Sequence, residues 1–405
     1  MVATVTNCND AGGGSLRAAM SGAVSGDTID LSHLACSTIT LTTGTLVAAV
    51  DNLTLQGPAD HHLAIDGGLT THHYNNAIVH SGSGILSLED MTITDAKYKD
   101  GGGLGGCIWS NGSVYLGRTV VSNCQVANST AAGNATGAGV WARGTVTAKH
   151  SRIVDNIALS ENASALGGGI YAKGSITAVS NTISGNQAQG DGASEGGGIF
   201  VEGNLLLSQT TLSGNASAIG GGLFVDGRNS TMRPGILNST ISGNSADDVG
   251  GVFARVSTGF FNDTIAFNTA SAASSAAAGI YLEVDSVVES TIVIMNQAGI
   301  TLDINGAQGV TVTGGHNMIS VWGNITLAGS HIGGSADDIF PLADHGGPPL
   351  THALRPASLA INGGTNLPSA TQDQRGASFP RLVGSSPDIG AFEFNPDIIF
   401  VNGFN

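Results

Sequence analysis

A short pattern of alternating apolar and polar residues recurs between residues 105 and 300. Each copy begins with glycines and continues with an aliphatic, an aromatic, a small and a polar residue, as in Ile170-Tyr171-Ala172-Lys173. The aromatic positions are separated by 32, 30, 29, 24, 29 and 28 residues and are Trp109, Trp141, Tyr171, Phe200, Phe224, Phe253 and Tyr281. Such variable spacing is typical of a solenoid, whose turns change in length while its strands stay in register.

A second pattern follows in each unit, with the form Thr-Ile/Leu-Ser-Gly-Asn. Its clearest copies end at Asn186, Asn215 and Asn244, and weaker copies end at Asn123, Asn156 and Asn268. The alternating residues predict a strand with one buried side, and the Gly-Asn pair predicts a turn because both residues tolerate positive φ. Asparagines at equivalent turns can bond neighbouring turns, so we expect a structural asparagine ladder.

Each unit holds two or three short strands and no helical segment, so it cannot bury its apolar face alone. Stacking places the strands of successive rungs about 4.8 Å apart, and the crossover preference favours a right-handed coil. We therefore predict an all-β fold, a single-stranded right-handed parallel β-helix (solenoid) of about 10–12 rungs with a cap at each end. The expected division is an N-terminal cap in residues 1–38, the β-helix in residues 39–340 and a C-terminal capping segment in residues 341–405, which ends in a short apolar tail.

The composition argues against two classes of binding partner. Charged residues make up 11% of the chain and the formal net charge is −16, which argues against nucleic acid or an anionic membrane, since both are bound through clusters of Lys and Arg. No run of 18 apolar residues predicts a transmembrane helix. The strand-like residues directly after Met1 suggest an expression start after a removed leader.

Four cysteines allow three pairings. We favour Cys8 with Cys36 and Cys107 with Cys124, because each pair lies close in sequence, although four buried free thiols are the alternative. Disulfides would fit an oxidising compartment.

The two ends carry motifs that resemble those of exported bacterial proteins. The segment from Val5 to Ala19 resembles the N-terminal cap of bacterial surface β-helix proteins. The C-terminal motifs are similar to those of choice-of-anchor Q domain proteins and are His345-Gly346-Gly347-Pro348, Thr351-His352-Ala353-Leu354, Ser358-Leu359-Ala360-Ile361-Asn362, Asp373-Gln374-Arg375-Gly376 and Pro387-Asp388-Ile389-Gly390-Ala391-Phe392-Glu393. The central glycine-rich units resemble polymorphic outer-membrane protein repeats. The resemblance implies a right-handed parallel β-helix exported by bacteria and little about activity, and Asn362 departs from the usual Asp.

Alternation assigns the faces of the repeat. If Ile170 and Ala172 point inward, the aromatic positions form one outer ladder, beside a polar ladder. The polar ladder is Asn111, Arg143, Lys173, Glu202, Asp226, Arg255 and Glu283. Exposed aromatic faces could bind sugar rings, with Trp109, Trp141, Tyr171, Phe200, Phe224, Arg255 and Tyr281 as the candidate contacts. The structural alternative is that the rings stack under the turns and the charges solubilise the sheet.

Two catalytic schemes fit the polar ladder. Glu202 and Asp226 fall on adjacent rungs, about the carboxyl separation of retaining glycoside hydrolases. Alternatively, Lys173 could remove a proton alpha to a uronate, with Arg143 or Arg255 stabilising the carboxylate, as in polysaccharide lyases. No cofactor is predicted; calcium is the one candidate ion, and the sequence defines no ligand set for it.

We therefore expect a secreted or cell-surface bacterial protein, a monomer, that binds an extracellular glycan or another cell surface through one sheet face, in the manner of an adhesin. The alternatives are a polysaccharide lyase or glycoside hydrolase acting on a linear polysaccharide, and a structural passenger without a ligand.

Overall fold

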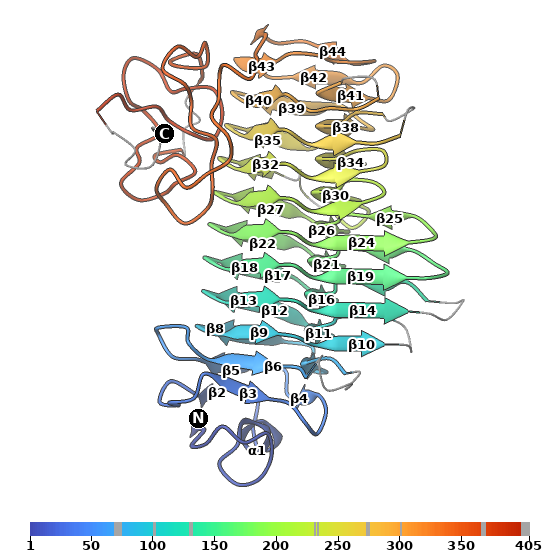
Figure 1. The fold of residues 1–405 in the computed structure, drawn as a ribbon, viewed down its shortest axis with the longest axis vertical. Coiled ribbons are helices and arrows are strands. Elements are labelled where there is room, and N and C mark those ends of the chain that lie inside the picture. Colours follow the sequence, from blue (N-terminus) through green and yellow to red (C-terminus); the bar gives the residue numbers. More distant parts are fainter. Residues whose placement is uncertain are drawn as a thin grey trace.

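The computed structural model describes residues 1–68, 75–99, 103–128, 133–230, 232, 235–272, 276–299, 302–365 and 370–397. The apolar tail predicted after residue 397 lies outside these residues. The chain forms a right-handed parallel β-helix of about ten turns, which confirms the predicted fold (Figure 1).

Three long parallel sheets form the coil. The 13-stranded sheet runs from β1 (Val2–Thr4) to β44 (Thr326–Leu327), and the 12-stranded sheet runs from β3 (Thr38–Thr40) to β45 (His331–Ile332). The 10-stranded sheet runs from β4 (Leu46–Ala48) to β41 (Ile304–Gly306). Every pair of strands within the three sheets is parallel, and equivalent residues of successive rungs lie opposite one another, as Ile170 does with Ile199.

The core lies inside the coil, as the alternation predicted. In β21 (Ile170–Ala172), Ile170 and Ala172 are completely buried among the inward residues of the neighbouring rungs, whereas Tyr171 points to the other side of the sheet and joins a separate cluster. Inward positions are filled by Ile, Leu, Val and Ala. Each rung therefore buries its apolar side only against the rungs above and below it.

The middle rungs hold more strands than the sequence predicted. A 7-stranded sheet runs from β10 (Lys97–Lys99) to β37 (Thr269–Ala270). A 3-stranded sheet consists of β15 (Ala135–Thr136), β20 (Ala165–Leu166) and β25 (Ser194–Glu195). These strands follow the Asn turns and are short and rich in Ala, Ser and Gln, so they lack the aliphatic alternation that marks the main strands.

The predicted asparagine ladder is confirmed, with one change at its start. Gly185, Gly214 and Gly243 have positive φ, and the asparagine after each glycine points into the coil. The Asn215 amide nitrogen donates to Asn244 Oδ1 and to the carbonyl of Ile183, both at 2.9 Å. Identical bonds link the stacked asparagines Asn156, Asn186, Asn215, Asn244, Asn268 and Asn296. Asn123 instead has a φ of 55° itself, and Cys124 occupies the ladder position.

The N-terminal end of the coil is covered by a short helix. Helix α1 (Leu16–Ser21) is capped by Ser15, whose hydroxyl oxygen accepts from the Ala18 backbone N–H, and it buries Leu16 and Met20 against the core. The first strands of the coil already lie within residues 1–38, since β1 pairs with β2 (Asp27–Asp30) and β2 pairs with β5 (Leu53–Gln56).

The C-terminal segment, residues 338–397, does not lie over the end of the coil, where the sequence interpretation placed it. It packs along the flank, beside the later strands of the 12-stranded sheet (Figure 1). Ile292 and Ile294 of β40 (Ile292–Ile294) point outward and bury Ile339, Leu354 and Phe392. The unbroken apolar sequence Ile292-Val293-Ile294 is the signal of a sheet buried on both faces.

Both predicted disulfides are present. Cys8 is bonded to Cys36, and Cys107 is bonded to Cys124. Among the described residues, no helix is long and apolar enough to cross a membrane.

Replacing Asn215 with Ala should destabilise the coil by about 3 kcal/mol, because it leaves buried groups on both neighbouring rungs without hydrogen-bond partners. The midpoint of chemical unfolding measures this loss. Asn111→Ala is the control, since Asn111 is only half-buried and its amide nitrogen makes one long hydrogen bond, at 3.4 Å. Equal midpoints for the two variants would contradict the structural role of the ladder.

Candidate functional site

Acidic and basic side chains meet at one edge of the 10-stranded sheet. They come from β25 and from the turns after β26 (Ile199–Val201), β30 (Leu223–Val225), β34 (Val252–Ala254) and β38 (Ile280–Leu282). We call this group the charged cluster; its members are Glu195, Glu202, Asp226, Arg228, Arg255 and Glu283. Val201 lies opposite Val225, so Glu202 and Asp226 follow adjacent rungs, as the register of the sequence predicted.

Arg255 holds the charged cluster together. Its Nη1 donates to Asp226 Oδ1 at 3.0 Å, and its Nη2 donates to Glu195 Oε1 at 3.3 Å. Its Nε lies 3.8 Å from Glu283 Oε1. The guanidinium lies 4.7 Å from the centroid of the Phe224 ring, a cation–π distance. One arginine therefore bridges three carboxylates and covers the aromatic ladder.

The two carboxylates predicted to act as a catalytic pair already have hydrogen-bond partners. Glu202 accepts from the Tyr171 hydroxyl and, at 3.1 Å, from Asn229 Nδ2. Asp226 accepts from Arg228 Nε in addition to Arg255. Burial raises the pKa of Tyr171, and the bond to Glu202 raises it further. These bonds compete with any role of the two carboxylates as free bases.

Glu195 is the member of the charged cluster that sequence reasoning missed. Burial raises the pKa of the Glu195 carboxyl; Arg255 opposes that shift, and the Asp226 charge adds to it. The sequence signal was weak, because Glu195 precedes the glycine turn and lies outside the repeating polar ladder. Arg255 therefore brings the carboxyls of Glu195 and Asp226 to one place, and two neighbouring carboxyls are what glycoside hydrolysis uses.

Of the basic residues of the lyase hypothesis, only Arg255 belongs to the charged cluster, although Lys173 follows the strand next to that of Glu202, since Ala172 lies opposite Val201. Lys173 and Arg143 are exposed, and Arg143 Nη1 donates to Asn111 Oδ1 at 3.3 Å. The hydrogen bonds described for Glu202 and Asp226 come from Tyr171, Asn229, Arg228 and Arg255. Of the predicted cations, the structure therefore brings only Arg255 into ion pairs with the charged cluster in the part of the chain that it describes.

The aromatic ladder points away from the core, as predicted, but a second layer covers it. Successive rings are stacked with centroids 4.9–6.2 Å apart. Trp141, Tyr171, Phe200, Phe224 and Phe253 are at most 8% exposed, whereas the end residues Trp109 and Tyr281 are half-buried. The covering side chains come from the segment before each strand and are Leu104, Leu166, Ile219, Val249 and Ala276. The five inner rings therefore present no free face to a sugar.

A different apolar surface is exposed on the 13-stranded sheet. We call it the apolar strip; it consists of Val179, Leu206, Leu237, Phe261 and Val287. Leu206 is 41% exposed and the others are half-buried. Leu206, Gly235, Gly259 and Val287 lie opposite one another on β27 (Leu205–Ser208), β31 (Gly235–Leu237), β35 (Gly259–Phe261) and β39 (Ser286–Glu289).

Glycine makes the centre of the apolar strip flat. A Cβ atom at Gly259 would lie 2.4 Å from Phe261 Cε2, so the Phe261 ring lies across the face of its own strand. On earlier rungs the equivalent positions hold Thr54, Ser87, Tyr115, Thr147 and Thr177, and the outward column beside them holds Gln56, Glu89, Gly117 and Lys149. The outer face of this sheet therefore changes from mostly polar to apolar along the coil.

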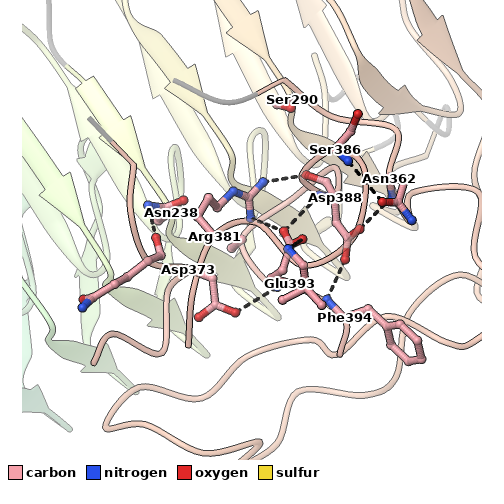
Figure 2. A network of polar contacts seen from close by, with 12 residues as sticks. Asn238, Ser290, Asn362, Asp373, Arg381, Ser386, Asp388, Glu393 and Phe394 are labelled. Atoms are coloured by element: carbon pink, nitrogen blue, oxygen red, sulfur yellow. Dashed lines mark hydrogen bonds and ion pairs between the residues drawn. The ribbon is translucent and has the colours of Figure 1, made fainter. Parts of the chain in front are cut away.

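The C-terminal motifs form a buried network against the flank of the coil (Figure 2). Arg381 donates to the Asp388 carbonyl at 2.6 Å and lies 3.8 Å from Glu393 Oε2. Glu393 accepts from the backbone N–H groups of Val383 and Asp388, and its own N–H donates to Asp373. These motif residues are buried, so they secure the segment rather than contact solvent.

The same network contains acids that favour the neutral form. Burial raises the pKa of Glu393 to about 7, with a further contribution from Asp388 and opposition from Arg381. Burial also raises the pKa of Asp388 and, on the coil side, of Asp263. His352 shifts the other way, since burial lowers its pKa to about 4. Its Nε2 accepts from Ser242 of the coil at 2.8 Å.

Among the described residues, no group of three or more His, Cys, Asp or Glu side chains could hold a metal ion. No protein-family model matches the chain, and no curated protein matches it. Among solved structures, the crystal structure of pectate lyase Pel9A aligns with 97% of this chain over 96% of its own length, at 15% sequence identity and a TM-score of 0.48. Similarity at this level carries no argument about activity. Membership of the choice-of-anchor Q family, which the terminal motifs suggested, therefore remains a prediction.

Replacing Glu393 with Gln should make the attachment of the C-terminal segment less sensitive to pH. Because the pKa of Glu393 is raised in the folded protein, its stabilising effect is complete below the unfolded pKa of about 4.5 and is lost as pH rises through about 7. The stability of Glu393→Gln relative to the wild type should therefore rise by about 1–3 kcal/mol between pH 4.5 and pH 8.

Chemical unfolding at matched pH values measures this difference. His352 contributes the opposite slope between pH 4 and 6.5, but it does so in both proteins, so the difference removes its effect. A pH-independent difference would show that Glu393 does not bind a proton on folding in this range.

Proposed function

We propose that this protein binds an extracellular glycan through the outer face of the 13-stranded sheet. The observation that carries the proposal is the apolar strip, a flat apolar surface on a face that is mostly polar on the earlier rungs. This surface lies on a different sheet from the aromatic ladder, whose inner rings are buried. Binding is still proposed to occur through one sheet face, as the sequence predicted.

The chemistry of the apolar strip fits a pyranose polymer. The Phe261 ring and the side chains of Leu206 and Leu237 offer apolar contact for the C–H faces of sugar rings. Ser208, which lies opposite Leu237, could bond sugar hydroxyls, whereas Glu289 opposite Phe261 already accepts from the Gly315 N–H and the Thr365 hydroxyl. Equivalent positions repeat about every 4.8 Å along the coil, so a linear chain could contact several rungs at once.

An extracellular setting supports the same proposal. Two disulfides staple the N-terminal rungs, and disulfides persist in oxidising compartments. We also infer from the terminal motifs that the protein is an exported bacterial β-helix of the choice-of-anchor Q type, a relationship that a search with homologous sequences would test.

Phe261→Ala and Leu206→Thr should each weaken binding to a soluble polysaccharide by about tenfold, the loss of about 1.4 kcal/mol of apolar contact. Affinity electrophoresis against neutral and uronic-acid polysaccharides measures the retardation. Ile85→Thr is the matched control, because Ile85 is 47% exposed on the same sheet but lies far from the apolar strip. Retardation that is equal in all three variants and the wild type would refute the binding surface.

A second candidate is glycoside hydrolysis at the charged cluster, favoured by the raised pKa of Glu195 beside the ion-paired Asp226. Glu195 would donate a proton to the leaving oxygen, and Asp226 would act on the opposite side as base or nucleophile. Hydrolysis is disfavoured because Arg228 and Arg255 already donate hydrogen bonds to Asp226.

Release of reducing ends from the same polysaccharides tests the second candidate. Cleavage that disappears in Glu195→Gln would establish hydrolysis, and products absorbing near 235 nm would indicate a lyase instead. Retardation in the gel without cleavage would leave binding as the function.

A further inference from the structure

The C-terminal end of the coil is open. β44 and β45 are the last strands of their sheets, and each pairs with a strand on one side only. Figure 1 shows the C-terminal segment beside this end and not over it. The edges of these strands therefore present unpaired backbone N–H and C=O groups, which proteins ordinarily cover or block with charge.

The apolar side chains of the last rung are correspondingly uncovered. Leu327 lies opposite Val312, and it is half-buried, whereas Val312 is 2% exposed. Around it, Val321, Trp322 and Ile332 are 38%, 41% and 36% exposed. This end thus exposes apolar side chains among the polar residues Asn324, Thr326 and Ser330, and such a mixture is typical of a surface that is buried in an assembly.

The same end carries no formal charge. Residues 304–336 contain no Asp, Glu, Lys or Arg, although the whole chain is 11% charged with a net charge of −16. Charge on a strand edge is the usual device that prevents edge-to-edge pairing, and it is missing here. Because the chain as a whole is negative, a surface without formal charge adds least to the repulsion between two copies.

The opposite end of the coil differs from the open end. β1 is also an edge strand, and Val2 is 66% exposed, but helix α1 lies over the first rungs with Leu16 and Met20 buried beneath it, and the Asp10–Arg17 ion pair lies at its start. A head-to-tail contact would have to pack the apolar open end against this capped and charged end. A contact between two C-terminal ends around a two-fold axis matches apolar surface with apolar surface, is closed and uses the same surface on both copies.

We propose that the occupant of the open end is a second copy of this chain, so that the protein forms a tail-to-tail dimer in place of the monomer expected from its sequence. In such a dimer, β44 and β45 meet edge strands of the second copy in antiparallel fashion, and Trp322 and Ile332 of each copy become buried. The dimer would place one apolar strip on each side of the contact, since the strip ends at β39, two strands before β44, and two nearby strips favour multivalent attachment to a polymer.

Analytical ultracentrifugation between about 1 and 100 µM tests the dimer, a range that covers ordinary self-association. The wild type should sediment with twice the monomer mass at the upper concentrations, and the double variant Trp322→Glu/Ile332→Glu should remain monomeric. Ile85→Glu, which places the same charge at a comparably exposed site on a sheet face, should leave the dimer intact. Circular dichroism establishes that each variant retains its strands.

Cysteine cross-linking tests the symmetry. No described cysteine is free, so an introduced thiol reports on its own position. Thr326→Cys should form a disulfide-linked dimer on oxidation, and Ser21→Cys at the helical end should not. A wild type that is monomeric at all concentrations, a dimer that survives the double substitution, or equal cross-linking at both ends would each overturn the proposal.

Discussion

Constant register between successive rungs is the constraint on which the rest of this structure depends. Every inward residue must lie over an equivalent inward residue, so each rung needs turns of fixed geometry at the same places. Columns of residues with positive φ supply them, and the asparagine ladder fixes the next residue in place by bonds from rung to rung. Glycine, asparagine or aspartate occupies many of these positions because such residues adopt positive φ at low cost, but Arg118, His150 and Gln209 adopt it as well, so the stacking of rungs also imposes this conformation.

Because the register of the three main sheets is fixed, differences in rung length must be accommodated in the segments between their strands. The spacing between aromatic residues ranges from 24 to 32, and the extra residues form the loops and short strands that follow the asparagine turns. These additions fold back over the outer face of the 10-stranded sheet, and this is why the aromatic ladder is buried. The repeat predicted that the rings share one face, but it could not show what covers them, because Leu166 and Ile219 belong to irregular segments without a period of their own.

The same contrast between the regular repeat and the segments without a period decides which residues of the candidate site could be predicted. Glu202 and Asp226 were predictable as neighbours because they follow paired strands, and Arg255 continues the same column. Glu195 was not predictable, because it contacts Arg255 from a strand of the layer that covers the aromatic ladder. The two residues are 60 positions apart in the sequence. The place of the C-terminal segment was likewise hidden: His352 meets Ser242 across 110 residues. Its motifs were visible, but their role is internal packing.

The residues at the outward positions of the coil indicate which surfaces are available to bind other molecules. Alternation normally places Thr or Ser outward, so apolar outward residues mark surfaces that are meant to be covered. Apart from single residues such as Val47 and Ile85, four groups of such residues stand out in the described part of the chain. The aromatic ladder is covered by the loop layer, and Ile292 and Ile294 are covered by the C-terminal segment. The apolar strip and the last rung break the same rule, yet nothing within the described chain covers them. Because a coil held together by register gains no stability from exposed apolar groups, these two surfaces are where contacts with other molecules should be sought.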